Sequence, residues 1–496
     1  MTHDSLEANL REMEQTRERY WRRYPATSPT KLHWRALTVR HAFHVLPGER
    51  VLELGAGSGL WTEHLTAALK GECPITAVVF DEQFAEQLDA RGLPNVEVAH
   101  VHDLAEDLPA ESFDYVVGTA IICHDRYGEN LRALHRLLKP GGQLLFFEAN
   151  FWNPQVLVKS VVGPVGRWAG NAECQIGMRR WKLLQQASRS GYVELEVIPY
   201  DILHPRAPAE LIPAIQSTAY LLERVPGVRE LCGTLYIWAR KPGVRRSRLP
   251  NVNLATHASL HGSTSVVIPC HNEASTLPRL VRALLDSYDD YIHEIVVVDD
   301  SSTDETAEVA RSLAAEDPRV RLIRRTSDPG VGGALRAGYA AATGRYVLSL
   351  DCDFVLIVPE LRDLFDAVAE GRDGAIGSRF SHQSVLVNYP LPKILANRAF
   401  HLLLRPFLGR RVRDVSNNLK LYRTDVVREL EITEPGFAAN AEIGVQPLLA
   451  GRDIEEVPMS WVDRAPDMGT SAFHIARAGP GYVRVLARLA RDKASR

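Results

Sequence analysis

The sequence has few cysteines for its length, and they do not group in a way that would hold a metal. Six cysteines are scattered through 496 residues, with no Cys-x-x-Cys pair and no cluster of zinc ligands. This pattern excludes a zinc-ribbon fold and a small disulfide-stapled scaffold. We therefore expect reduced, mostly buried thiols in a cytoplasmic protein.

Long apolar runs and an excess of one charge are also missing. No uncharged run reaches the roughly 18 residues that a membrane-spanning helix needs, and the charged N-terminal segment lacks the apolar core of a signal peptide. The formal net charge is only −3, which argues against nucleic acid as a partner. The sequence predicts a cytoplasmic protein, soluble or peripheral to a membrane.

Apolar strand-like runs alternate with helical patterns twice, over about residues 50–148 and 264–378. Such alternation is typical of α/β domains built on parallel sheets. The polar segment 241–263 carries two prolines and no apolar periodicity, as a linker does. We predict two doubly wound α/β domains, at 1–242 and 263–496, with 243–262 as the linker.

The first half carries a glycine-rich loop after an apolar strand. Residues 51–54 run into Gly55, Gly57 and Gly59, and a helix-like segment follows. Glycines allow a ligand to approach the backbone closely, and the helix start offers free N–H groups. The loop alone would equally fit a dinucleotide site or close packing. Further on, Asp103 closes a strand, and another strand is followed by a helix, an LKPGG turn and a third strand.

This order of motifs resembles the class I S-adenosylmethionine-dependent methyltransferases over about residues 35–242. The resemblance implies that Glu53 and the loop Gly55–Gly59 flank the methionine part of the cofactor, and that Asp103 meets the adenine amino group. The family usually carries an acidic residue at the end of the second strand to hold the ribose hydroxyls. Val79 stands there in this chain. Either Asp81 or the glutamate after it takes that role, or the ribose is held less tightly.

Methyl transfer depends on alignment, and a base helps only where the acceptor is a hydroxyl. His124 follows the fourth strand and is the candidate to face the acceptor. The same residue would equally suit the lining of the cofactor pocket or the cap of the next helix.

The second half has strands that end in carboxylates. The first breaks at Pro269 ahead of Glu273, the second ends in Asp299 and Asp300, and a loop containing Gly332 leads to a strand closed by the aspartates at 351 and 353. Two carboxylates one residue apart need a cation between them. With oxygen ligands and a diphosphate, Mg²⁺ or Mn²⁺ is the natural choice.

These motifs resemble family 2 glycosyltransferases of the GT-A fold, especially the polyprenyl-phosphate sugar synthases related to dolichol-phosphate mannosyltransferase, over about residues 263–473. The resemblance implies an inverting reaction, with the metal on Asp351 and Asp353. Arg379 and Arg464 would face phosphate groups. The nucleotide-sugar donor would be bound by Pro269, Glu273, Asp299, Asp300, Gly332, Asp351 and Arg379.

The chain departs from these synthases at three places. Val355 replaces a glutamine, Asp414 begins Asp-Val-Ser-Asn-Asn-Leu in place of Asp-x-Thr-Ser-Gly-Phe, and the Gly-x-Ser-Lys element near the end lacks its lysine. Two of these changes fall where a phosphate acceptor would be bound. A hydroxyl acceptor would need a general base, for which Glu442 and Asp414 are the candidates. Glu442 would alternatively brace an arginine.

The stretch 385–411 combines leucine and phenylalanine with basic residues. It would suit an anionic membrane surface or equally a helix packed under the sheet or at a dimer interface. We expect a bifunctional enzyme that transfers a sugar from a nucleotide sugar and a methyl group from S-adenosylmethionine onto one small-molecule or secondary-metabolite product. The alternative is a polyprenyl-phosphate sugar synthase with an attached methyltransferase or non-catalytic cofactor-binding module.

Overall fold

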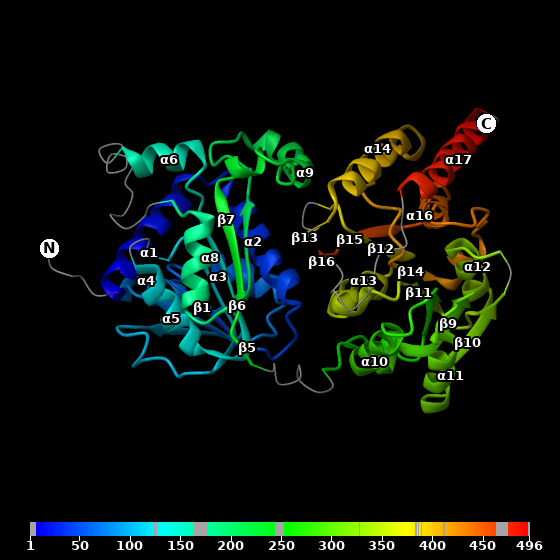
Figure 1. The fold of residues 1–496 in the computed structure, drawn as a ribbon, viewed down its shortest axis with the longest axis horizontal. Helices are drawn as coiled ribbons and strands as arrows, with labels where there is room; N and C mark the ends of the chain where they lie inside the picture. Colours follow the sequence, from blue (N-terminus) through cyan, green and yellow to red (C-terminus); the bar gives the residue numbers. More distant parts are fainter. Residues whose placement is uncertain are drawn as a thin grey trace. The chain divides into compact units, whose positions relative to one another are not determined.

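The computed structural model describes residues 6–494 except 123–125, 163–176, 244–251, 327, 382–383, 385, 388, 410–411 and 463–474. The chain forms two compact units, Met1–Leu249 and Pro250–Arg496 (Figure 1). None of the helices in the described ranges is long and apolar enough to span a membrane.

The first unit is built on a seven-stranded sheet with the order β3-β2-β1-β4-β5-β7-β6. The first five strands of that order pair in parallel, and β7 joins β5 and β6 by antiparallel pairing. The order reverses between β1 and β4, which places a crevice at the carboxyl ends of these strands. The strands are β1 Val51–Leu54, β2 Ile75–Val79, β3 Val96–His100, β4 Phe113–Thr119, β5 Leu138–Ala149, β6 Val193–Tyr200 and β7 Thr234–Arg240.

Helices cover both faces of this sheet. Leu52 and Leu54 of β1 belong to a core that includes residues of α1, α5 and α8, while Val51 belongs to a core with residues of α2 and α3. Successive residues of a strand point to opposite faces, so a strand covered on both sides is mostly apolar, and Glu53 is the one charged residue of β1. The helices are α1 Leu6–Arg23, α2 Ser28–Phe43, α3 Leu60–Ala68, α4 Glu82–Asp89, α5 Tyr127–Leu137, α6 Pro154–Val161, α8 Arg180–Arg189 and α9 Ile212–Leu222.

The second unit also has a seven-stranded sheet, with the order β10-β9-β8-β11-β14-β12-β15. The strands β10, β9, β8 and β11 run in parallel, and β14 lies antiparallel between β11 and β12. A short ladder pairs β13 with β16. The strands are β8 Thr264–Cys270, β9 Ile292–Asp300, β10 Val320–Arg325, β11 Tyr346–Ser349, β12 Gly374–Ser378, β13 Leu386–Val387, β14 Lys420–Arg423, β15 Ile454–Pro458 and β16 Trp461–Val462.

Two long helices, α14 and α17, pack against each other and against α16 beside this sheet (Figure 1). Their contact is an apolar cluster that includes Phe400, Leu404 and Tyr482. The helices of the unit are α10 Leu277–Tyr288, α11 Thr306–Glu316, α12 Val331–Ala341, α13 Leu361–Ala369, α14 Leu391–Leu408, α15 Thr424–Arg428, α16 Ala439–Leu449 and α17 Ile475–Ala494. The predicted α/β class with two doubly wound domains is confirmed, and the structure adds antiparallel strands to each sheet.

Candidate functional site

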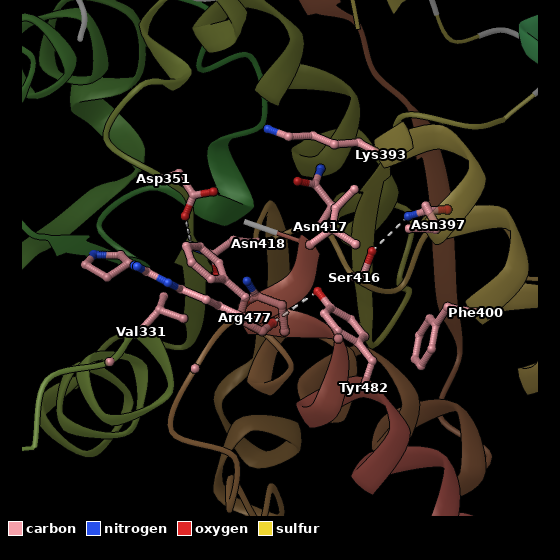
Figure 2. Close-up of a pocket in the computed structure, with 18 of the residues that line it drawn as sticks. Val331, Asp351, Lys393, Asn397, Phe400, Ser416, Asn417, Asn418, Arg477 and Tyr482 are labelled. Atoms are coloured by element: carbon pink, nitrogen blue, oxygen red, sulfur yellow. Dashed lines mark hydrogen bonds between the residues drawn. The ribbon is translucent and has the colours of Figure 1, made fainter. Parts of the chain in front are cut away.

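A cavity of about 730 Å³ opens at the carboxyl ends of β8, β9 and β11 in the second unit. Acidic residues line it on the side of these strands, and residues of α14 and α17 line it on the other side (Figure 2). The reversal of strand order between β8 and β11 positions the cavity, because the loops after these two strands leave in opposite directions.

Asp351 and Asp353 follow β11 and both line the cavity. The amide of Asn418 donates a hydrogen bond to Asp351 Oδ1 at 2.7 Å (Figure 2). Burial and the neighbouring Asp353 raise the pKa of Asp351 to about 6. A divalent cation would relieve this repulsion, and carboxylate oxygens are the ligands that Mg²⁺ and Mn²⁺ take. The described residues contain no group of three His, Cys, Asp or Glu side chains that could hold a metal.

Pro269, Glu273 and Asp300 line the same cavity as Asp351. Asp300 accepts a hydrogen bond from Gly330 N at 2.5 Å and forms an ion pair with Arg325. The loop before α12 is thereby tied to the end of β9.

Asp299 and Gly332 lie behind the cavity wall. The Asp299 carboxylate is fully buried and accepts from Ser302 N at 3.1 Å. A Cβ atom on Gly332 would lie 2.0 Å from the carbonyl oxygen of Glu434, so glycine is required there for close packing of α12. The resemblance implies a donor-binding role for both, but the residues that line the cavity are their neighbours Asp300, Gly330 and Val331.

Arg379 lines the cavity and is held by Asp414 in a two-pronged ion pair, with N–O distances of 2.7 and 3.0 Å. Burial would raise the pKa of Asp414, but the Arg379 guanidinium overrides this effect and holds that pKa below its usual range. A carboxylate so firmly ionised is a poor proton acceptor. The structure therefore argues against Asp414 as a general base and gives it the role of orienting Arg379.

Glu442 is also committed to other groups. Its carboxylate accepts from Thr433 N at 2.9 Å and Glu434 N at 2.8 Å, and it pairs with Arg488. Glu442 does not line the cavity, so the expectation of a general base is corrected to a brace for the 433–434 turn and for Arg488. The other two predicted catalytic residues, Arg464 and His124, lie outside the described residues.

Aromatic and cationic side chains of two helices also line the cavity. Lys393 and Phe400 come from α14, and Arg477 and Tyr482 come from α17 (Figure 2). Sequence reasoning did not identify the α17 residues, because nothing local links a C-terminal amphipathic helix to a distant site. It also missed Lys420, which lies fully buried behind the cavity. Burial lowers the pKa of Lys420 to about 7.

In the first unit the predicted cofactor loop follows β1 as expected. Gly55, Gly57 and Gly59 have φ of 64°, 59° and 83°, a region in which other residues are strained. The Glu53 carboxylate is 1% exposed and, among the described residues, has no hydrogen-bond partner for either oxygen. Burial raises the pKa of Glu53 to about 7. A buried carboxylate without a hydrogen-bond partner beside a glycine turn fits a ligand that brings its own hydrogen-bond donors.

The other two predicted cofactor residues carry local hydrogen bonds. Asp81 caps α4 by accepting from Gln83 N at 3.0 Å. Asp103 accepts from Ala105 N at 2.6 Å and Glu106 N at 3.1 Å. Both therefore stand at the ends of β2 and β3, and each keeps lone pairs for a ligand.

Sequence comparison connects both units to known families. A model of glycosyl transferase family 2 matches residues 265–431, and a model described as a methyltransferase domain matches residues 51–142. An undecaprenyl-phosphate mannosyltransferase of Micrococcus luteus is 31% identical over 225 residues, which is 44% of this chain and 90% of the relative. A polyprenol monophosphomannose synthase of Mycolicibacterium smegmatis is 31% identical over 215 residues, 42% of this chain and 80% of the relative.

Solved structures resemble each half more distantly. Glucosyl-3-phosphoglycerate synthase of Mycobacterium tuberculosis, solved with Mn²⁺, uridine diphosphate and phosphoglyceric acid, is 21% identical with a TM-score of 0.38, over 48% of this chain and 80% of that chain. Phosphoethanolamine N-methyltransferase 2 of Haemonchus contortus, solved with S-adenosylmethionine, is 16% identical with a TM-score of 0.33, over 42% of this chain and 52% of that chain.

Proposed function

This chain belongs to glycosyl transferase family 2 through its second unit and carries a methyltransferase domain in its first, and from this fusion we propose a bifunctional transferase. The second unit transfers a sugar from a nucleotide-sugar donor with the help of Mg²⁺ or Mn²⁺. The first transfers a methyl group from S-adenosylmethionine. One small-molecule product receives both groups, since fusion keeps the two sites at high effective concentration.

The observation that carries the sugar-transfer proposal is the pair Asp351 and Asp353 on the cavity wall, with Asn418 fixing the first carboxylate at 2.7 Å. These residues would hold a divalent metal ion, which would supply positive charge to the diphosphate leaving group. Arg379, oriented by Asp414, offers a planar guanidinium to a phosphate group. Pro269 and Glu273 would contact the nucleoside of the donor.

A second candidate acceptor is a polyprenyl phosphate, and a specific observation favours it. Both carboxylates that were candidate bases, Asp414 and Glu442, are bound to arginines. A phosphate acceptor is already a nucleophile and needs no base. The lining of the cavity combines apolar side chains with Lys393 and Arg477, which suits an acceptor with an anionic head and an apolar body. The names of the relatives support the same acceptor class.

For the methyl-transfer site, the cofactor brings a methyl group on a sulfonium, and the protein supplies position. The glycine turn at Gly55–Gly59 lets the ligand approach the backbone, and Glu53 would accept from its ammonium group. Asp103 would accept from the adenine amino group. These roles require alignment more than proton transfer.

Product analysis tests the proposal. The full-length protein would be incubated with deuteromethyl S-adenosylmethionine, a nucleotide-sugar panel, Mn²⁺ and either host extract or a polyprenyl phosphate, and the products identified by mass spectrometry. Asp351→Ala should abolish sugar transfer, whereas Asp286→Ala, an exposed aspartate of α10, should leave it unchanged. Sugar on the polyprenyl phosphate alone would identify the lipid acceptor. Undiminished sugar transfer in Asp351→Ala would contradict the metal-dependent mechanism.

A further inference from the structure

The N-terminal helix α1 buries charged side chains against the glycine turn of the first unit. Glu14, Arg17 and Glu18 are 0%, 3% and 4% exposed. Burying charge is costly unless it is paired or serves a ligand. In the sequence this segment stands out only as charged, so the burial of these groups calls for an explanation.

The Glu14 carboxylate lies between the ends of β1 and β2. Its Oε1 accepts from Gly57 N and its Oε2 accepts from Phe80 N, both at 3.0 Å. Gly57 belongs to the turn after β1, and Phe80 follows the last residue of β2. In doubly wound nucleotide-binding folds, an acidic group about 20 residues after the glycine turn binds the ribose hydroxyls at this end of the second strand.

The residues of β2 itself do not place a carboxylate there. Val79 is apolar and fully buried. Asp81 lies two residues further on, where one oxygen caps α4 and the other accepts from Gln15 Nε2 at 2.7 Å. Glu14 therefore brings to the end of β2 the carboxylate that the strand lacks. A carboxylate has about four lone-pair positions, and Glu14 uses two of them on the backbone.

Arg17, one helical turn after Glu14, supports the same conclusion. Its NH1 donates to Thr119 O at 3.3 Å, but its Nε has no hydrogen-bond partner within the described part of the chain. Both oxygens of the nearby Glu53 carboxylate likewise have no hydrogen-bond partner among the described residues. Unsatisfied donors and acceptors around one turn match a ligand that carries both charges and hydroxyl groups.

We propose that α1 forms part of the cofactor site and that Glu14 binds the ribose hydroxyls of the adenosyl group. This inference rests on the proposed cofactor of the first unit. Glu14 keeps its two backbone hydrogen bonds and accepts from the vicinal hydroxyls with its remaining lone pairs. The helix that precedes the α/β domain in sequence thus completes the nucleoside site.

Binding measurements with a matched ligand pair test this role. Titration calorimetry would compare S-adenosylhomocysteine with its 2′-deoxy analogue on the full-length protein. Wild type should bind the ribose form about 10-fold more tightly, as expected for one hydrogen bond to a charged acceptor. Glu14→Gln should lose most of that preference, and Glu14→Asp, which keeps the carboxylate, should retain part of it.

Glu18→Gln is the control, because the Glu18 carboxylate on the same helix is already engaged by Ser58 and Arg22. It should keep the full preference for the ribose form. An unchanged preference in Glu14→Gln, or tighter binding of both ligands, would overturn the role of Glu14 while leaving the cofactor proposal intact. Absence of any binding by wild type would instead refute the proposed cofactor, and this inference with it.

Discussion

At the residue scale, His401 of α14 shows how the wall of the cavity formed by this helix is held in place. The imidazole is 5% exposed, with Nδ1 bonded to Asn397 O at 2.8 Å and Nε2 accepting from Val415 N at 2.9 Å. A neutral ring can make both hydrogen bonds, whereas a protonated ring cannot accept. The His401 side chain thereby links α14 to the segment that also carries Asp414, the partner of Arg379.

This histidine predicts a pH dependence of stability. Burial lowers the pKa of His401 to about 4 from 6.5, so between these values the unfolded chain binds the extra proton and the folded chain does not. The contribution of His401 is therefore complete above pH 6.5 and is lost as the pH falls toward 4. Its size is about 3 kcal/mol.

Thermal unfolding of the second unit at several pH values measures this effect. The unfolding temperature should fall between pH 6.5 and 4.5 in wild type. His401→Gln, which keeps one donor and one acceptor but does not titrate, should flatten that part of the curve. The prediction fails if both proteins lose stability with the same slope.

At the element scale, α14 and α17 together form the wall of the cavity opposite the acidic residues. The rings of Phe400 and Tyr482 meet edge to face at 4.9 Å, and both side chains line the cavity. Leu402 of α14 is 63% exposed instead, which marks the opposite side of that helix. The two helices therefore shape one wall of the cavity, which is the acceptor side in the proposed function.

Truncating the Phe400 side chain should weaken binding of the acceptor and leave binding of the nucleotide sugar unchanged. We expect Phe400→Ala to raise the KM for the acceptor by about 10-fold or more, since truncating a buried aromatic ring removes on the order of 2 kcal/mol of apolar contact. The KM for the nucleotide sugar should change little. Steady-state kinetics with each substrate varied in turn measures both values. Leu402→Ala, on the exposed side, is the control, and an equal rise in both KM values would contradict this division of the cavity.

At the scale of the whole molecule, two units of similar size each carry their own sheet, and the proposed function assigns one ligand site to each. Ligands that bind only the folded state protect the unit that holds them, by about 2.7 kcal/mol at a ligand concentration 100 times Kd. S-adenosylhomocysteine should therefore slow hydrogen exchange in β1, β2 and α1. A nucleoside diphosphate with Mn²⁺ should slow it around β8, β11 and the turn before β14.

Hydrogen exchange of the full chain, followed by mass spectrometry, tests this separation. Asp351→Asn should remove the protection by the nucleoside diphosphate and leave that by S-adenosylhomocysteine unchanged. If Asp351→Asn also lost the protection by S-adenosylhomocysteine, the two ligands would not bind independently.

The sequence by itself determined the α/β class, the pairing of a methyltransferase domain with a glycosyl transferase domain, and the positions of the glycine turn and the Asp351–Asp353 pair. These features are local: strand periodicity, glycines with positive φ and carboxylates at strand ends are each specified within a few residues. The position of Pro269, Glu273 and Arg379 at the cavity could be predicted in the same way, because parallel strands bring their carboxyl ends to one edge of the sheet.

Only the tertiary structure decided which polar side chains are available for chemistry. Asp414 and Glu442 are carboxylates of the kind that can act as general bases. Each is bound instead by an arginine distant in sequence, Asp414 by Arg379 at 35 residues and Glu442 by Arg488 at 46 residues. Gly332 has the appearance of a ligand-binding glycine, yet the backbone at Glu434 requires it. Glu14 reaches Phe80 across 66 residues. Contacts at such separations depend on how the elements pack, and neither periodicity nor motif spacing encodes them.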